Sequence, residues 1–189
     1  MSENGKVRLE RFVRAELGED QASLFDTIAF GERSKGPQRF SLLGQDGALE
    51  GPFNAMLLAP KLGFALQQLG AAIRYSTSLS PRIREAAILM VAARWNCEFE
   101  RRAHEPLALD AGFSADDVAS IASGELPRCE TPAERAALAA AKAILRTGDI
   151  TDADFEGCVS SLGEPAIFEL MTLVGYYQTL AIQLRVFRV

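Results

Sequence analysis

The chain has 189 residues, a formal net charge of −5 and 48% hydrophobic residues, which are ordinary values for a globular protein with a sizeable core. The negative charge argues against a protein that binds nucleic-acid phosphates, and no apolar run approaches the roughly 18 residues of a membrane span. Residues 1–6 lack the apolar core of a signal peptide. The sequence therefore predicts a cytoplasmic protein with neither a nucleic acid nor a membrane as partner.

The N-terminal part predicts two short helices followed by a long loop. Residues 7–17 and 20–30 have amphipathic patterns that end near glycines, so each predicts a helix. Residues 31–54 contain repeated glycines and two Gly-Pro pairs, which are typical of an irregular connection. Loops of this length are uncommon inside a domain and are often functional.

A helical hairpin is predicted next, over residues 58–75 and 81–95. Ser80 is the expected N-cap of its second helix, and Pro81 occupies the first helical position. The following helix is expected over residues 97–111, where a glycine ends it.

Four more helices are predicted in the C-terminal part, over residues 114–124, 131–146, 151–161 and 164–189. Thr131 and Glu134 have the spacing of a capping box, with a proline between them at the first helical position. No convincing alternation of period two appears anywhere, so the predicted fold class is all-α.

The three cysteines, Cys97, Cys129 and Cys158, are widely spaced, and no two of them form a CxxC pair. A structural zinc site and a thioredoxin-like dithiol are therefore disfavoured. The single histidine excludes a multi-histidine metal centre within one subunit. We predict no metal and no organic cofactor, and each cysteine is by default a small buried hydrophobe in a reducing compartment.

Functional side chains gather around the single histidine, His104. Glu85 precedes eight uninterrupted apolar residues, so we expect it to be buried with a raised pKa, although a carboxylate there also suits the helix dipole. Cys97, Glu100, Arg101 and His104 follow with spacings of three, four and seven residues, which places all four on one face of a helix.

Each candidate also has a simpler interpretation. Glu100 and His104 can hydrogen-bond and raise the imidazole pKa, but the spacing alone favours a solvated surface pair. Cys97 is either a nucleophile near His104 or a packed thiol. Arg82 and Arg84 are either solvated charges or anchors for a substrate carboxylate.

Several ordered motifs carry a family resemblance. They are Gly51-Pro52-Phe53-Asn54-Ala55-Met56-Leu57-Leu58, Arg82-Ile83-Arg84-Glu85-Ala86-Ala87-Ile88-Leu89, Phe99-Glu100-x-x-Ala103-His104, Ala111-Gly112-Phe113-Ser114 and Gly175-Tyr176-Tyr177. Together they resemble the carboxymuconolactone decarboxylase family, whose relatives include the AhpD-type alkylhydroperoxidases. The resemblance implies an AhpD-like helical domain over residues 51–189, with a central helical hairpin, preceded by an arm and irregular connection over residues 1–50. It also implies self-association, as a trimer or hexamer or else a dimer, with the site near a subunit interface.

The chain departs from the AhpD-type pattern at one important position. Glu85, Cys97 and His104 occupy the glutamate, first-cysteine and histidine positions, but Glu100 stands where the second cysteine should be. A dithiol peroxidase cycle would therefore need an outside thiol or a distant cysteine. Arg101 stands where the decarboxylase branch carries tryptophan, which adds a positive charge.

The leading functional prediction is a decarboxylase-like carboxy-lyase that acts on a small carboxylated, lactone-like substrate. Glu85, Glu100 and His104 would supply the acid–base chemistry. The predicted substrate-binding residues are Arg82, Arg84 and Arg101. The alternatives are a thiol-dependent (hydro)peroxidase of the peroxiredoxin type that uses Cys97 alone, and a non-catalytic oligomeric ligand-binding protein. The sequence names neither the substrate nor the number of subunits.

Overall fold

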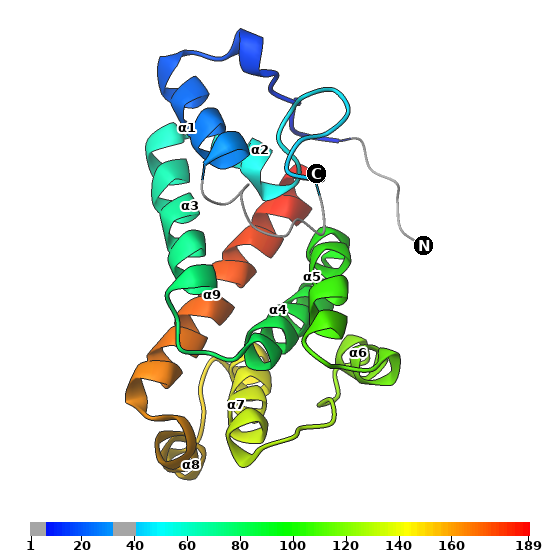
Figure 1. Ribbon diagram of the computed structural model, residues 1–189, viewed down its shortest axis with the longest axis vertical. Helices are drawn as coiled ribbons and strands as arrows, with labels where there is room; N and C mark the ends of the chain where they lie inside the picture. Colours follow the sequence, from blue (N-terminus) through cyan, green and yellow to red (C-terminus); the bar gives the residue numbers. More distant parts are fainter. Residues whose placement is uncertain (1–6, 32–40) are drawn as a thin grey trace. The chain divides into compact units, whose positions relative to one another are not determined.

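The computed structural model describes residues 7–31 and 41–189, and these ranges form nine α-helices and one short 3-10 helix (Figure 1). Within them no β-strand forms, and β pairing is limited to two isolated bridges, Val13 with Ala48 and Leu43 with Leu49. The all-α prediction is confirmed. No single helix of the described part is long and apolar enough to cross a membrane, although the bent pair of helices Asp152–Leu162 and Glu164–Phe187 passes that test together.

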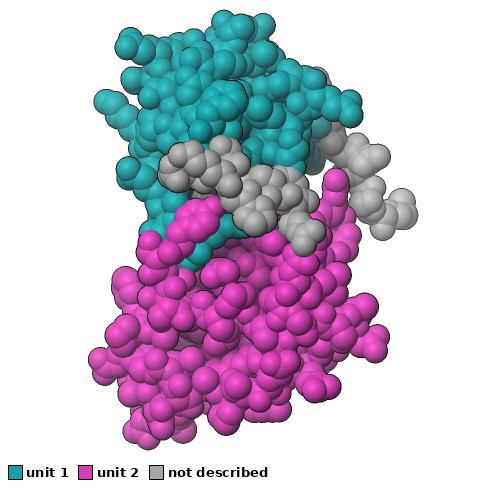
Figure 2. Space-filling view, viewed as in Figure 1, with its two compact units in different colours: residues 1–74, 182–189 teal, residues 75–181 magenta. Residues whose placement is uncertain are grey.

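The chain divides into two compact units, which Figure 2 colours separately. Unit 1 comprises Met1–Arg74 and Ile182–Val189, and unit 2 comprises Tyr75–Ala181. The division by family resemblance into residues 1–50 and 51–189 stays a prediction.

Unit 1 contains the N-terminal helices: η1 (Arg14–Glu16), α1 (Glu19–Phe30), α2 (Pro52–Met56) and nearly all of α3 (Pro60–Tyr75). The helix predicted over residues 20–30 is confirmed as α1. In the predicted irregular connection, residues 41–51 have no helix, residues 32–40 lie outside the described part, and α2 begins before its expected end.

The helix predicted over residues 7–17 is wrong, because tertiary contacts replace its hydrogen bonds. The side-chain oxygen of Asn54 accepts from the Phe12 amide at 3.0 Å, and its amide nitrogen donates to the Glu10 carbonyl at 2.8 Å. These bonds satisfy backbone groups that a helix would have paired internally. Only the three residues of η1 turn helically.

Unit 2 contains the remaining helices: α4 (Pro81–Trp95), α5 (Glu98–Asp110), α6 (Ala115–Ala122), α7 (Pro132–Thr147), α8 (Asp152–Leu162) and α9 (Glu164–Phe187), the last as far as Ala181. These confirm the predicted helices from residue 81 onwards. Helix α4 packs against α5, α6 and α7. Every residue from Glu85 to Ala92 is buried, as the long apolar run predicts.

Local capping fixes where these helices start. The Ser80 hydroxyl accepts from the Ile83 amide at 3.2 Å, and the Thr131 hydroxyl accepts from the Glu134 amide at 3.0 Å. The predicted capping box is only half formed, because the Glu134 carboxylate accepts from the Glu130 amide instead of returning to Thr131. This difference leaves the other Glu134 oxygen available for a distant partner.

The turn between α4 and α5 has one left-handed residue, Asn96, at φ 47° and ψ 50°. Its amide donates to the Ala93 carbonyl, and the Cys97 amide donates to the Ala92 carbonyl at 2.8 Å, which is a Schellman motif. Asparagine tolerates this conformation better than most residues. The motif sets the direction in which α5 leaves α4.

Candidate active site

His104 lies between two carboxylates in unit 2. Its Nδ1 is 2.7 Å from Glu85 Oε2, and its Nε2 is 3.4 Å from Glu100 Oε2. Glu85 comes from α4, and both Glu100 and His104 come from α5. The exposed fractions of the three residues are 5%, 3% and 5% for Glu85, Glu100 and His104. The predicted catalytic residues therefore meet in a buried cluster, and the surface-pair interpretation of Glu100 and His104 is wrong.

The helices explain this convergence. Glu100, Ala103, His104 and Ala108 form the buried stripe of α5, at the three- and four-residue spacing of one helix face. Glu85 belongs to the buried part of α4, against which α5 packs. Two acids and one base are thus placed together by ordinary helix packing.

His104 carries a positive charge at neutral pH. Burial would lower the pKa of its imidazole, but contacts with Glu100 and Glu85 outweigh burial and raise that pKa to about 9. Both ring nitrogens then carry protons, so Nδ1 donates to Glu85 and Nε2 points its proton at Glu100. The predicted rise of the imidazole pKa is confirmed.

The expectation of a raised pKa for Glu85 is wrong. Burial acts to raise the pKa of this carboxyl group, but His104 and then Arg84 more than compensate, and the net shift is downward. The Arg84 Nε donates to Glu85 Oε1 at 3.2 Å. Glu85 is therefore an ionised acceptor that orients the imidazolium, which does not suit the role of general acid.

The cluster does not satisfy all of its own hydrogen-bonding groups. Glu100 Oε1 is buried and has no hydrogen-bond partner among the described residues. A buried acceptor without a partner costs about 1–3 kcal/mol. Two carboxylates also share one imidazolium, with Arg84 as the further cation in contact. This arrangement favours a polar group of a ligand beside Glu100.

The sequence interpretation missed Tyr177. Its ring meets the His104 imidazole edge-on, with centroids 5.3 Å apart, and the Tyr176 ring meets Tyr177 in the same way. Both tyrosines come from α9. The Gly175-Tyr176-Tyr177 motif was the available signal, since it formed part of the family resemblance.

Cys97, the candidate redox residue, is a buried thiol outside any disulfide. It precedes α5 as its N-cap and lines a small cavity of about 150 Å³ together with Arg101 and Ile121. Glu100 and His104 do not line that cavity. Burial raises the pKa values of the Cys129 and Cys158 thiols, as expected of cysteines without a redox role.

Of the three predicted substrate-binding arginines, Arg84 contacts the cluster. The Arg101 side chain is 43% exposed and pairs with Glu98 and Glu105 on its own helix, each at 2.6 Å. Arg82 binds Glu134 at 3.0 Å, and its guanidinium lies 3.9 Å from the centre of the Phe113 ring. The contacts of Arg101 and Arg82 are those of a surface charge and a structural cation.

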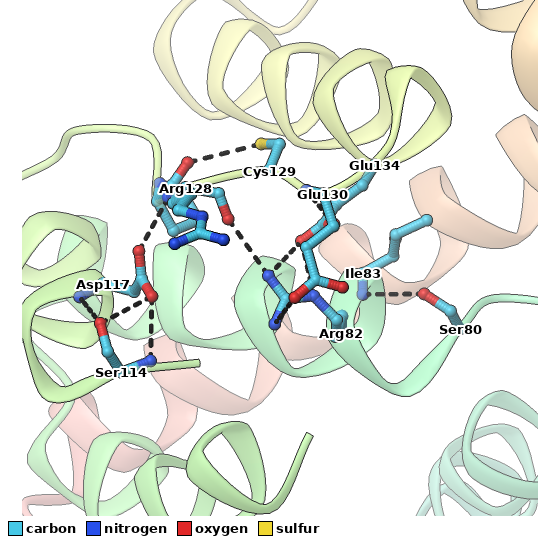
Figure 3. A network of polar contacts seen from close by, with 10 residues as sticks. Ser80, Arg82, Ile83, Ser114, Asp117, Arg128, Cys129, Glu130 and Glu134 are labelled. Atoms are coloured by element: carbon cyan, nitrogen blue, oxygen red, sulfur yellow. Dashed lines mark hydrogen bonds and ion pairs between the residues drawn. The ribbon is translucent and has the colours of Figure 1, made fainter. Parts of the chain in front are cut away.

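Figure 3 shows how Arg82 joins neighbouring elements. Its Nη2 donates to the Arg128 carbonyl at 3.1 Å, and its Nη1 lies 3.5 Å from Glu130 Oε1. The Arg128 amide donates to Asp117, which also accepts from the Ser114 amide and hydroxyl. The network ties α4 and α6 to the loop that precedes α7. Sequence reasoning missed Glu134 as its buried member.

In residues 7–31 and 41–189, no group of three or more histidine, cysteine, aspartate or glutamate side chains is arranged to hold a metal ion. The arrangement around His104 suits proton transfer and hydrogen bonding.

The fold is AhpD-like. A protein of unknown function from Agrobacterium tumefaciens, suggested to be the antioxidant defence protein AhpD, matches with a TM-score of 0.62 and 19% identity, over 74% of this chain and 96% of that chain. The debrominase Bmp8, solved as a cysteine-to-alanine variant with 2,3,4-tribromopyrrole, matches with a TM-score of 0.69 and 17% identity, over 100% of this chain and 92% of that chain. At these identities the likeness establishes the fold alone.

The sequence comparison points to one family. Residues 60–143 match the carboxymuconolactone decarboxylase family. The resemblance inferred from the motifs is confirmed, and Glu85, Glu100 and His104 all lie inside the matched segment. No curated protein matched the sequence.

Proposed function

We propose that this protein is an acid–base enzyme of the carboxymuconolactone decarboxylase family that acts on a small carboxylated, lactone-like substrate. The observation that carries the proposal is the buried imidazolium of His104 between two carboxylates, one of which keeps an oxygen that accepts from no described residue. A cluster built only for stability would satisfy its buried acceptors. This one instead keeps a proton available at a nitrogen.

Decarboxylation needs such a proton. When a β,γ-unsaturated lactone acid loses carbon dioxide, the electron pair of the broken C–C bond passes into an extended enolate, which must then be protonated at carbon. The His104 imidazolium supplies this proton and becomes neutral imidazole, which regains a proton from water. Glu85 keeps the ring oriented through Nδ1 and stays ionised throughout.

The remaining groups have roles in binding. Glu100 Oε1 accepts a hydrogen bond from the substrate, because it is buried and has no partner among the residues that the structure describes. Arg84, which already contacts Glu85, offsets the negative charge of the enolate oxygen. The proposal includes the self-association that the family resemblance implies, and light scattering during size-exclusion chromatography tests it.

The direct test is turnover of carboxymuconolactone, followed by release of carbon dioxide. The variants His104→Gln and Glu100→Gln should each lower kcat/KM by about 10²-fold or more, with an unchanged helical circular-dichroism spectrum. Arg101→Gln is the matched control and should keep near-wild-type turnover, since its guanidinium binds Glu98 and Glu105 on the surface. Wild-type turnover that survives in both site variants would contradict the assigned site.

The pH profile gives a second test. Because His104 must be protonated to donate, kcat/KM should fall as the pH rises through about 9, the pKa of its imidazole. A profile that rises across the same range would show that a neutral base is needed instead.

A second candidate function is peroxide reduction by Cys97. It is favoured by the position of this thiol in a cavity of about 150 Å³ beside Arg101. The thiolate would attack the peroxide O–O bond to give sulfenic acid and an alcohol, and an external thiol would reduce the sulfenic acid. Dimedone should then label Cys97 faster than Cys129 or Cys158 after addition of tert-butyl hydroperoxide. Equal, slow labelling would remove this candidate, and a wild type inactive in both assays would favour the non-catalytic binding protein.

A further inference from the structure

Unit 2 contains a larger cavity that the proposed chemistry does not use. Its volume is about 450 Å³, within the range of about 300–1,000 Å³ typical of small-molecule sites. Helices α4, α6 and α7 form its walls, and its floor is apolar. Met90 and Ile121 are buried in that floor, with Ala93 and Leu145 beside them.

Three cations surround this apolar floor: Arg94 from α4, and Lys142 and Arg146 from α7. No acidic side chain is among the residues that line the cavity. Lys142 pairs with the exposed Glu125 at 3.0 Å, whereas neither Arg94 nor Arg146 forms an ion pair with a described residue. Two positive charges at this cavity therefore have no acidic partner in residues 7–31 and 41–189, in a chain whose net charge is −5.

The helix dipole explains part of this pattern but not all of it. Arg94 and Arg146 each lie in the last turn of a helix, where a cation is favoured. That effect does not require the two arginines to meet at one cavity. It also does not favour Lys142, which precedes Arg146 by four residues on the same helix face and repels it. An anion bound between them would relieve this repulsion.

The cavity is separate from the His104 cluster. At about 100° per residue, Met90 lies about 140° and Arg94 about 180° around α4 from Glu85. None of Glu85, Glu100 and His104 lines it. One helix thus presents an acid to the cluster on one face and an arginine to the cavity on the opposite face.

We infer that this cavity binds a small amphipathic carboxylate. The apolar body would lie over Met90 and Ile121, and the carboxylate would remain at the rim between Arg94 and Arg146. A guanidinium pairs with a carboxylate through two parallel hydrogen bonds, which suits this head group. The Arg94 Nε donates to the Leu145 carbonyl at 3.3 Å, which holds this side chain beside α7.

The test compares octanoate with octanol, its neutral counterpart, by titration calorimetry at low salt. Octanoate should bind at least about tenfold more tightly than octanol, because only octanoate carries the charge. The double variant Arg94→Gln, Arg146→Gln should weaken octanoate binding about tenfold and leave octanol binding unchanged. The control Arg135→Gln removes a charge from α7 outside the cavity and should leave both affinities unchanged.

Two further variants keep the result interpretable. Ala93→Phe narrows the cavity and should weaken both ligands, which places the apolar body there. His104→Gln should bind octanoate as the wild type does, so this inference stands or falls independently of the proposed enzyme activity. Equal affinity for octanoate and octanol, no effect of the double variant, or no binding of octanoate at about 10 mM would each overturn it.

Discussion

Unit 2 contains two buried charged clusters that differ in how completely their carboxylates are paired. In the cluster of Figure 3, both oxygens of Glu134 accept: Oε1 from Arg82 at 3.0 Å and Oε2 from the Glu130 amide at 2.9 Å. In the other, Glu85 and Glu100 share His104, and Glu100 Oε1 accepts from no described residue. Both clusters include residues of α4. Among the described residues, the buried atom left without a hydrogen bond in the first cluster is a donor, Arg82 Nη1, which lies 3.5 Å from Glu130 Oε1, whereas in the second it is the carboxylate oxygen Oε1 of Glu100.

The way in which the charges of each cluster are paired indicates whether that cluster has a structural or a chemical role. Removing one partner of a buried ion pair lowers stability chiefly because the other charge is then buried without compensation. Two carboxylates around one imidazolium stabilise the proton on that ring, and Glu100 Oε1, which accepts from no described residue, leaves an acceptor for a ligand. The first arrangement predicts a role in stability, and the second predicts a role in turnover.

The largest expected effect is a loss of stability when the buried ion pair of Arg82 and Glu134 is broken. Glu134→Ala leaves the Arg82 guanidinium without its closest carboxylate and should lower the free energy of unfolding by about 3–5 kcal/mol. Urea denaturation measures this change. The control is Glu130→Ala, whose side chain is 55% exposed and which should cost less than about 1 kcal/mol. Equal losses in the two variants would contradict the structural role of the buried pair.

The next effect is the pH dependence that His104 gives to stability. Its pKa is raised from 6.5 to about 9 on folding, so its contribution is fully present below pH 6.5 and is lost as the pH rises through 9. The loss should amount to about 3 kcal/mol.

Thermal or urea unfolding of wild type and His104→Gln between pH 6 and 10 measures this contribution. Other groups titrate in that range, so the difference between the two proteins isolates the histidine. If the difference stays constant with pH, the imidazole does not gain its charge from Glu85 and Glu100.

A smaller effect is expected from Glu100→Gln, which removes one of the two carboxylates beside His104. Stability should change by less than about 1 kcal/mol, because the loss of an attraction is offset by the removal of a buried charge. The pKa of His104 should nevertheless fall, since Glu100 helps to raise it.

Nuclear magnetic resonance can read this pKa directly, because the chain contains one histidine. Glu98→Gln is the matched control, since Glu98 pairs with Arg101 on the exposed side of α5 and should leave the imidazole unchanged. A histidine pKa that responds equally to both changes would show that general charge, rather than the Glu100 contact, sets it.

The smallest effect is expected at Arg101. Its ion pairs with Glu98 and Glu105 are exposed pairs on one helix, so Arg101→Gln should change the free energy of unfolding by less than about 0.5 kcal/mol. A melting-temperature comparison with Arg84→Gln, which removes a contact to buried Glu85, sharpens the contrast. A larger loss at Arg101 than at Arg84 would reverse the interpretation of the two arginines.

The features that the sequence predicted correctly depend on residues that lie close together in the chain. Ser80 and Thr131 cap helices as expected, because each bond spans only three residues. The spacing of Glu100 and His104 likewise fixed their common face. The helix prediction for residues 7–17 failed because Asn54, more than forty positions further along the chain, forms hydrogen bonds with the backbone groups of Phe12 and Glu10.

The charge states depended on distant partners. Burial of Glu85 could be inferred from its apolar run, but the direction of its pKa shift depends on His104, 19 positions away in sequence. Arg82 could be noticed as a cation, but its partner Glu134 is 52 positions away. Such pairings follow from packing and not from any local pattern.

The left-handed Asn96 has a consequence for how this chain can change. Only Asn96 and Cys97 separate α4 from α5, and a Schellman motif holds them. A residue inserted into α5 ahead of Glu100 would rotate Glu100 and His104 together by about 100° relative to the helix start. The length of the connection therefore keeps Glu85 of α4 and His104 of α5 facing each other. Length changes should therefore be far less tolerated there than substitutions of exposed side chains.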